Sequence, residues 1–201
     1  MVAPIRLTAS DIYTYLRPAE CELRVHLLHR GEKPAPPGQL EQLLRELGIR
    51  HESQHQETVD ELSALGELLD LSGLDRPGRV EATLQAVNDR VPMIYQGALR
   101  AQTELSGVRC EILGDPDFLI RRESGYAVQD VKLARRITPG YHPEILASVQ
   151  LYGWLYQQTF GEAPQGLEVL SGDGSIITVE DDGGASALEL LTKVLAACEH
   201  F

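Results

Sequence analysis

The most informative segment of the chain is Gly114-Asp-Pro-Asp-Phe-Leu-Ile-Arg-Arg-Glu-Ser-Gly-Tyr-Ala-Val-Gln-Asp-Val-Lys132. Two runs of β-forming residues flank the turn signal Ser124-Gly125, which predicts two antiparallel strands joined by a turn. Side chains alternate between the faces of a strand, so Asp130 and Lys132 point to the same face. Because the first arm of this hairpin can bring Asp117 alongside Asp130, the segment predicts two carboxylates and one ammonium group in a small volume.

Strand signals continue on the N-terminal side of this hairpin. Residues 93–99 and 109–113 are rich in β-forming side chains, and Ser106-Gly107 is a turn signal between them. We therefore predict an antiparallel meander of three or four strands. Downstream, the predicted elements are a helix, two short strands and a closing helix, at residues 143–160, 167–170, 175–179 and 185–198.

The N-terminal half is predicted to be mainly helical. Ser10 is the expected N-cap of a first helix, which Pro18 interrupts. An apolar stripe with helical period indicates a long amphipathic helix over residues 39–71. Further helices are predicted at residues 19–29 and 80–87. No strand is predicted in this half.

The order of the predicted elements indicates the architecture. Helices, a β-meander, a helix, a strand and a helix are typical of an α/β fold with a mixed sheet flanked by helices. With 201 residues, the chain is long enough for one hydrophobic core and short for two. We predict a single domain over residues 1–201, mainly helical over 1–90, with the β-meander, helix, strand and helix core over 91–201.

Composition and charge limit the classes of function that the protein can have. The chain is 43% hydrophobic and 24% charged, and no apolar run approaches the ~20 residues that cross a bilayer, so no membrane partner is expected. The N-terminus carries no secretory pattern, so we expect a cytoplasmic location. The formal net charge of −12 argues against a large basic surface for nucleic acid. Any nucleic-acid binding must therefore depend on where the charges lie.

The cysteines and glycines predict neither a disulfide framework nor a nucleotide cofactor. Cys21, Cys110 and Cys198 are far apart and form no CxxC pattern, so we expect free thiols rather than disulfides or a zinc site. Gly172-Asp-Gly174 indicates a hairpin turn rather than a phosphate-binding loop. No nucleotide cofactor is therefore expected.

Asp117, Asp130 and Lys132 are the candidate catalytic residues. Carboxylates on rigid strands suit hard divalent cations. A neighbouring lysine can position or deprotonate water or stabilise charge on a phosphate, and the metal supplies Lewis acidity. Hydrolysis of a phosphodiester needs these elements. The alternative is a structural ion pair, since Asp-x-Lys on a strand is common by chance.

Four short motifs follow one another along the chain. They are Gly48-Ile-Arg-His-Glu52, Pro116-Asp117, Asp130-Val131-Lys132 within its longer β segment, and Gln150-Leu-Tyr-Gly-Trp154. In this order they resemble the motifs of the PD-(D/E)xK nucleases, in particular the RecB-like branch. The resemblance implies a restriction-endonuclease-like α/β core and metal-dependent hydrolysis of DNA.

The resemblance also implies a role for each central residue. Asp117 and Asp130 would bind Mg²⁺ or Mn²⁺, with the backbone carbonyl of Val131 and the side chain of His51 as further ligands. Lys132 would position the attacking water. The expected active site thus combines a metal and a lysine.

Further residues are expected to meet the substrate. The resemblance implies that Gln150 orients the site or the substrate strand. Trp154 stands where the family usually has tyrosine, so an aromatic ring is kept without its hydroxyl, and we expect it to contact substrate. Arg135 and Arg136 are candidate phosphate contacts on their charge alone. The alternative for these two residues is an ordinary solvated basic pair.

Cofactors and partners follow from the same resemblance. Some relatives hold an iron–sulfur cluster on four cysteines; this chain has three, so no cluster is expected. Many relatives are nuclease modules of longer helicase-containing chains, so a helicase or another protein is an expected partner, beside single- or double-stranded DNA ends. A histidine in the first motif favours exonucleolytic processing, in DNA repair, recombination or defence.

Two other functions remain open at this stage. His51-Glu-Ser-Gln-His55 fits the HExxH pattern of zinc proteases, whose two histidines lie one helical turn apart, although no third ligand is identified. The second alternative is a nuclease-like fold that does not cut and serves as a DNA-binding or scaffolding module. Metal preference and the effect of removing Lys132 separate these functions.

Overall fold

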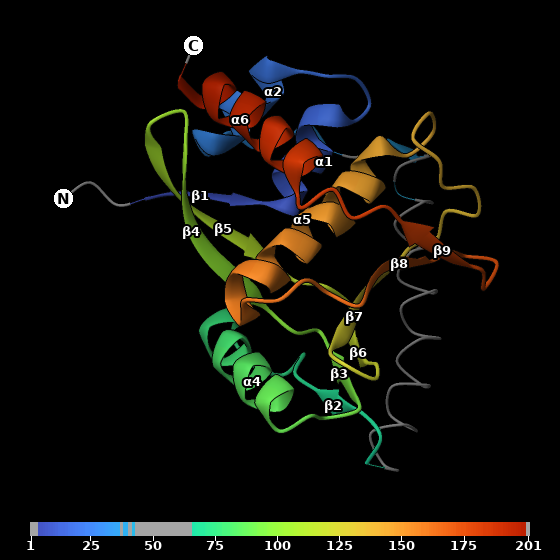
Figure 1. Cartoon of the computed structure of the whole chain (residues 1–201). Coiled ribbons are helices and arrows are strands. Elements are labelled where there is room, and N and C mark those ends of the chain that lie inside the picture. Colours follow the sequence, from blue (N-terminus) through green and yellow to red (C-terminus); the bar gives the residue numbers. More distant parts are fainter. Residues whose placement is uncertain (1–3, 37, 40–41, 43–65, 200–201) are drawn as a thin grey trace.

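The computed structural model describes residues 4–36, 38–39, 42 and 66–199, which form helices packed on two β-sheets (Figure 1). The helices are α1 (Ala9–Leu16), α2 (Glu22–His29), α4 (Arg76–Asn88), α5 (Pro143–Phe160) and α6 (Ala185–Glu199). The strands are β1 (Ile5–Thr8), β2 (Leu69–Asp70), β3 (Met93–Tyr95), β4 (Leu99–Leu105), β5 (Val108–Gly114), β6 (Phe118–Arg121), β7 (Tyr126–Val131), β8 (Gly166–Leu170) and β9 (Ile176–Val179). In the described part of the chain, no helix has the length and apolar character needed to cross a membrane.

The larger sheet contains the predicted hairpin. Its six strands lie in the order β2-β3-β6-β7-β8-β9. β6 and β7 pair antiparallel, with Phe118 opposite Gln129, whereas β7 and β8 pair in parallel. This mixed sheet, with helices packed against it, confirms the predicted α/β class.

The single meander is a wrong prediction, because the strands divide between two sheets. The smaller sheet has the order β1-β5-β4, with β4 antiparallel and β1 parallel to β5. The segment predicted as one strand at residues 93–99 breaks at Gln96, whose φ of 54° lies in the left-handed region. At that point the chain leaves β3 and enters β4 of the other sheet.

β1 and β2 contradict the prediction that the N-terminal half contains no strand. β1 is four residues long and pairs with β5, with Ile5 opposite Cys110. β2 is two residues long and pairs with β3, with Leu69 opposite Ile94. Both strands are short and their partners lie far along the chain, so no local sequence pattern indicates them.

The helix predicted at residues 80–87 extends further toward its N-terminus. α4 begins at Arg76, because the side chain of Asp75 accepts a hydrogen bond from the Gly78 N–H at 2.9 Å and Pro77 occupies the first turn. The additional turn carries two arginines, Arg76 and Arg79, which form ion pairs with Asp115 close to the candidate site.

Other N-terminal boundaries also differ from the predictions. Thr8, not Ser10, caps α1, through a capping box, and α2 begins only at Glu22. The long helix predicted over residues 39–71 lies mostly outside the described residues. At its predicted C-terminal end, Leu69–Asp70 is a strand, so that boundary is wrong.

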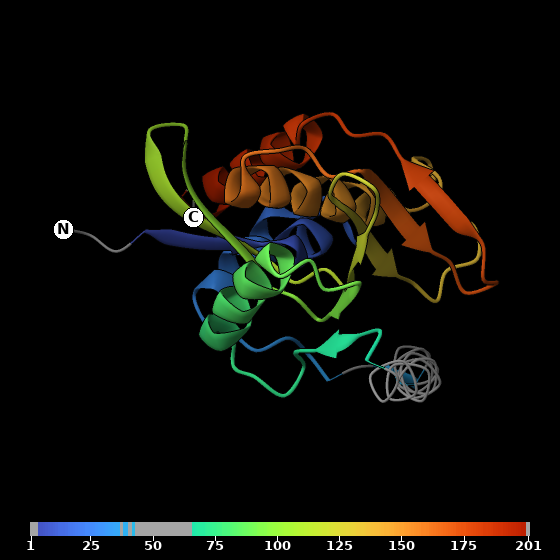
Figure 2. The same cartoon turned by 60° about the horizontal axis from the view of Figure 1, so that its bottom comes forward.

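α5 is the central packing element, and its predicted bounds are confirmed. Pro143 occupies its first turn, and Gly161, with φ of 78°, follows its last residue. α5 contacts β4 and β5 of the smaller sheet and β7, β8 and β9 of the larger one, and it packs beside α1 and α6 (Figures 1 and 2). It therefore holds the two sheets in one hydrophobic core. β8, β9 and α6 also lie close to their predicted ranges.

The surroundings of Gly114 show how closely α5 packs on β5. A Cβ at Gly114 would lie 2.5 Å from Leu155 Cδ1 and 2.7 Å from Tyr152 Cδ1, both on α5. We expect Gly114→Ala to lower the free energy of unfolding by about 1–3 kcal/mol, the usual cost of overpacking, as measured by urea denaturation. At Gly73 a new Cβ has no atom within 4 Å, so Gly73→Ala is the control. A fully stable Gly114→Ala variant would contradict this close packing.

Candidate active site

The β6–β7 hairpin brings the predicted acidic residues together. Asp117 immediately precedes β6, and the antiparallel register sets it opposite Asp130. The Val131 N–H donates a hydrogen bond to Asp117 Oδ2 at 2.7 Å. Lys132 Nζ lies 2.5 Å from Asp130 Oδ2. Asp117, Asp130 and Lys132 thus form one group, as the strand alternation predicts.

Asp130 is a buried carboxyl group in an unfavourable environment. Only 2% of the residue is exposed. Burial raises the pKa of Asp130 to about 7; the Lys132 ammonium opposes this shift, and the Asp117 carboxylate adds to it. The ionised form of Asp130 therefore costs free energy even with the Lys132 ammonium beside it.

The raised pKa of Asp130 makes its charge destabilising in the metal-free protein. The unfolded chain ionises such a carboxyl at about pH 3.9, whereas the folded protein does so at about 7. Folding stability is therefore lost as the pH rises from the first value to the second. We expect Asp130→Asn to raise the Tm in EDTA, and to raise it more at pH 8 than at pH 5. Each kcal/mol gained in the free energy of unfolding should raise the Tm by about 2–4 °C.

Asp173 provides the contrasting control. Hydrogen bonds from Ser171 and Ser175 lower the pKa of Asp173, so its charge is favourable in the folded state. Asp173→Asn should therefore not raise the Tm at pH 8. An Asp130→Asn variant that gains no stability at pH 8 would show that the folded protein accommodates the ionised Asp130 without cost.

A pocket of about 310 Å³ lies beside Lys132. Its lining consists of Tyr13, Arg17, Lys132, His142, Glu144, Ile145 and Ser148. Glu144 Oε1 is 2.8 Å from Arg17 Nη2 and 3.0 Å from His142 Nδ1. Burial alone would raise the pKa of Glu144, but the hydrogen bonds from Arg17 and His142 hold it below its usual value. The buried Glu144 carboxylate thus holds the side chains of Arg17 and His142 in place at the pocket.

The structure gives Gln150 and Trp154 partners outside the acidic group. Gln150 Nε2 donates a hydrogen bond to the Glu180 carbonyl at 3.2 Å. Trp154 is buried and packs against the backbone of Gly184. Successive residues of a helix point about 100° apart. Side chains two positions apart on α5 therefore point in nearly opposite directions.

Tyr152 is a site residue that the sequence analysis did not assign. Its buried ring packs on Gly114, three residues before Asp117. Burial raises the pKa of Tyr152 well above its usual value, and the nearby carboxylates of Asp130 and Asp117 add to the shift. Tyr152 lies four residues after Ser148, which lines the Lys132 pocket, so both side chains are on the same face of α5. Only the structure shows that this face meets β5.

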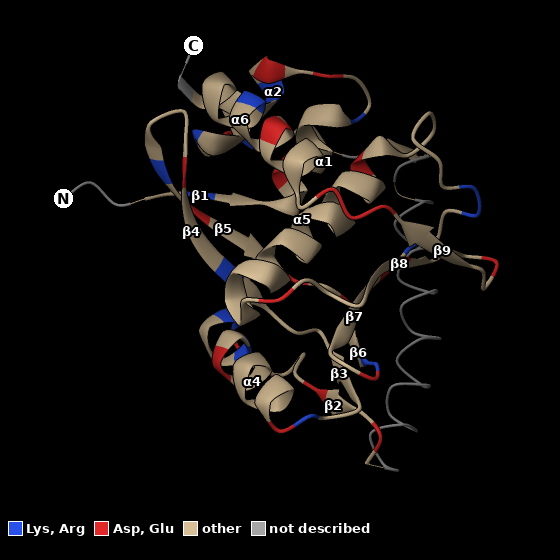
Figure 3. Cartoon of the chain, in the orientation of Figure 1, with Lys and Arg blue, Asp and Glu red and all other residues tan. Residues whose placement is uncertain are grey.

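Two further predicted site residues follow β7 in the chain, and a third lies outside the described residues. Arg135 and Arg136 are exposed on the loop that joins β7 to α5, where Figure 3 shows a basic segment. His51 lies outside the described residues, as does His55. Their predicted roles therefore stay predictions.

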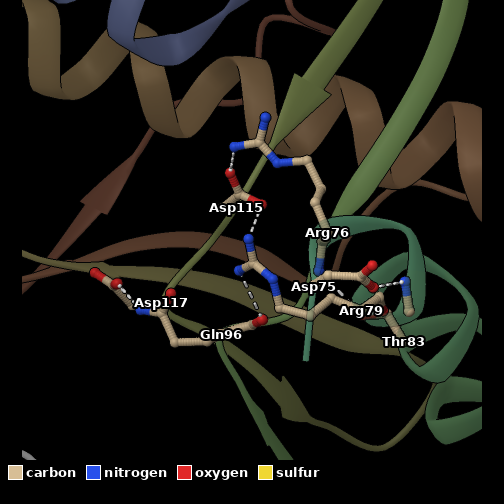
Figure 4. A network of polar contacts seen from close by, with 9 residues as sticks. Asp75, Arg76, Arg79, Thr83, Gln96, Asp115 and Asp117 are labelled. Atoms are coloured by element: carbon tan, nitrogen blue, oxygen red, sulfur yellow. Dashed lines mark hydrogen bonds and ion pairs between the residues drawn. The ribbon is translucent and has the colours of Figure 1, made fainter. Parts of the chain in front are cut away.

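Asp117 and its neighbour Asp115 belong to a wider polar network (Figure 4). Arg76 and Arg79 of α4 form ion pairs with Asp115, that of Arg79 at 3.0 Å. Gln96 Nε2 donates a hydrogen bond to Asp117 Oδ1 at 2.8 Å. α4 and the end of β3 thus hold the segment that carries Asp117.

The donors present suit a hard divalent cation. Asp117 and Asp130 supply two adjacent carboxylates, and the Lys132 ammonium does not fully offset the burial of the Asp130 charge. Over residues 4–36, 38–39, 42 and 66–199, no group of three or more His, Cys, Asp and Glu side chains is placed to hold a metal ion. A cation here would therefore need further ligands, such as backbone carbonyls, waters or His51.

Comparison with known proteins does not assign the chain to a family. No protein-family model matches the chain, and no curated protein matches it. One similar solved structure is described as "Crystal structure of SSO0001", with 15% identity over 98% of this chain and 78% of that chain, at a TM-score of 0.46. This similarity is too low to assign a fold family or a function.

Proposed function

We propose that this protein is a Mg²⁺- or Mn²⁺-dependent deoxyribonuclease with a restriction-endonuclease-like core, similar to the RecB-like PD-(D/E)xK nucleases. The observation that carries the proposal is the grouping of Asp117, Asp130 and Lys132 at one end of the β6–β7 hairpin. Cleavage from DNA ends is favoured over internal cleavage. Its context would be DNA repair, recombination or defence.

The carboxylates have the role of holding the cation. Asp117 and Asp130 would be its ligands, with the Val131 carbonyl and His51 as further predicted ones. When bound, the ion supplies Lewis acidity and lowers the pKa of water. Its charge would also stabilise the ionised form of Asp130, whose burial is otherwise unfavourable.

Lys132 would contact the attacking water or the phosphate directly. Its side chain is 35% exposed and lines the pocket, whereas that of its partner Asp130 is 3% exposed. An ammonium group offers three N–H donors. In the proposal, one of these positions the attacking water or binds a phosphate oxygen, while Asp130 fixes the direction of the lysine side chain.

The substrate strand would approach through the pocket beside Lys132. Arg17 and His142 line this pocket and are fixed by the buried Glu144, so they can bind phosphate without first ordering. Arg135 and Arg136 lie on the loop that follows β7. These side chains would concentrate positive charge near the site, in a protein whose net charge is −12.

Lys132→Ala tests the proposed enzyme. We expect cleavage of end-labelled single- and double-stranded DNA with Mg²⁺ or Mn²⁺, but not with Zn²⁺, and a loss of about 10²–10⁴-fold in the variant, the usual contribution of a positioned acid–base group. The product ladder shows whether cutting begins at ends.

Lys193→Ala is the matched control. Lys193 is exposed and pairs with Glu189 on α6 at 2.9 Å, so its removal should leave cleavage unchanged. No cleavage by folded wild-type protein with any of the three metals would reject the nuclease and favour a DNA-binding or scaffolding module. The same outcome would make a protease assay with Zn²⁺ the next test of the HExxH pattern.

Arg135→Ala combined with Arg136→Ala tests whether these arginines bind phosphate. For single-stranded DNA, we expect weaker binding and a log–log salt dependence that is less steep by about 0.7 for each phosphate that the variant no longer neutralises. The measurement is fluorescence anisotropy in EDTA over a range of salt concentrations. Arg30→Ala with Arg109→Ala removes the same charge from other exposed positions, so it is the control. Equal salt slopes for both double variants would mean that Arg135 and Arg136 are solvated surface residues.

A further inference from the structure

Asp115 and Asp117 lie two residues apart but have different kinds of partner. Asp115 forms ion pairs with the guanidinium groups of Arg76 and Arg79. Asp117 accepts hydrogen bonds from two uncharged groups, the Gln96 side-chain amide on Oδ1 at 2.8 Å and the Val131 N–H on Oδ2 at 2.7 Å. The two arginines therefore offset the charge of Asp115, whereas these amide donors orient Asp117 and leave its negative charge in place.

Gln96 is held in an uncommon backbone conformation at this position. Its φ of 54° lies in the left-handed region, which costs non-glycine residues about 1–3 kcal/mol. The Gln96 N–H donates a hydrogen bond to the Asp117 carbonyl at 2.8 Å, and Arg79 Nη1 donates one to the Gln96 carbonyl at 3.2 Å. Both ends of the residue are thus fixed, and its side chain is directed to Asp117 (Figure 4).

α4 fixes the two residues that follow Gln96 as well. The buried Thr83 Oγ1 accepts a hydrogen bond from the Ala98 N–H at 3.0 Å. A Cβ at Gly97 would lie 3.2 Å from the same oxygen, so the absence of a side chain allows this approach. Several contacts therefore fix the turn from β3 to β4, which explains how the strained φ of Gln96 persists.

We propose that Gln96 is a positioning residue, which orients the Asp117 carboxylate for binding of a divalent cation. This inference rests on the proposed function. A carboxylate oxygen has two lone pairs, so one N–H donor on each oxygen fixes the direction of the group and leaves one lone pair on each for a metal. A neutral amide suits this role, because a cationic partner would reduce the attraction of Asp117 for the ion.

Gln96→Asn separates this role from a structural one. Asparagine also tolerates positive φ and keeps an amide, but it is one methylene shorter and does not reach Asp117. We expect Mn²⁺ to bind about 10–100-fold more weakly, the usual effect of losing a residue that orients a metal ligand, as measured by titration calorimetry with MnCl₂ on the full chain. The Tm in EDTA should remain within about 2–4 °C, the change that 1 kcal/mol produces.

A second variant and a control complete the test. Gln96→Gly removes the amide altogether and keeps both backbone hydrogen bonds, so it should lose at least as much Mn²⁺ affinity. Excess Mn²⁺ should restore DNA cleavage in both variants. Gln85→Asn is the matched control, because Gln85 Nε2 donates a hydrogen bond to Asp89 at 2.9 Å on the surface of α4. It should bind Mn²⁺ as the wild type does.

The possible failures are distinguishable. One outcome is that the unmodified protein binds Mn²⁺ and cleaves DNA, and that Gln96→Asn and Gln96→Gly bind Mn²⁺ equally well. This outcome would overturn the role of Gln96 and leave the nuclease proposal intact. Equal losses in the Gln85→Asn control would also overturn it. Wild-type protein that neither binds Mn²⁺ nor cleaves DNA would overturn the nuclease proposal and this inference together.

Discussion

The pairing register of β6 and β7 is the constraint on which the candidate active site depends. A shift by one residue would turn every side chain of β7 to the opposite face of the sheet. The Val131 N–H on Asp117 Oδ2, at 2.7 Å, defines one end of the hairpin, and the Arg122 N–H on the Gly125 carbonyl, at 2.8 Å, closes the other. Only this register sets Asp130 opposite Asp117.

Two helices from distant parts of the chain brace the segment that enters this hairpin. On one side, Tyr152 of α5 packs on Gly114, and on the other, arginines of α4 form ion pairs with Asp115. The same segment ends at Asp117, which is held by donors on both carboxylate oxygens. The braced segment thus sets Asp117 beside the buried carboxyl group of Asp130, of which only 2% is exposed.

The candidate site is only partly predictable from sequence. Strand alternation is enough to group Asp130 with Lys132, and a hairpin turn brings Asp117 to them, because these relations are local. The roles of Gln96 and Tyr152 depend on contacts across the fold. Gln96 is the point at which a segment with the composition of one strand breaks, and Tyr152 is distinguished from Trp154 only by which face of α5 meets β5.

The sequence by itself determined the β6–β7 hairpin, the elements from α5 to the C-terminus, and the acidic pair with its lysine. Each of these depends on periodicity, capping or turn residues within about 20 neighbouring positions. Only the tertiary structure decided that the strands divide between two sheets, that β1 pairs with β5, and that α4 supplies arginines to Asp115 and a buried threonine to the β3–β4 turn. The physical reason is that these contacts join residues far apart in the chain, where the geometry of packing, rather than any local pattern, selects the partner.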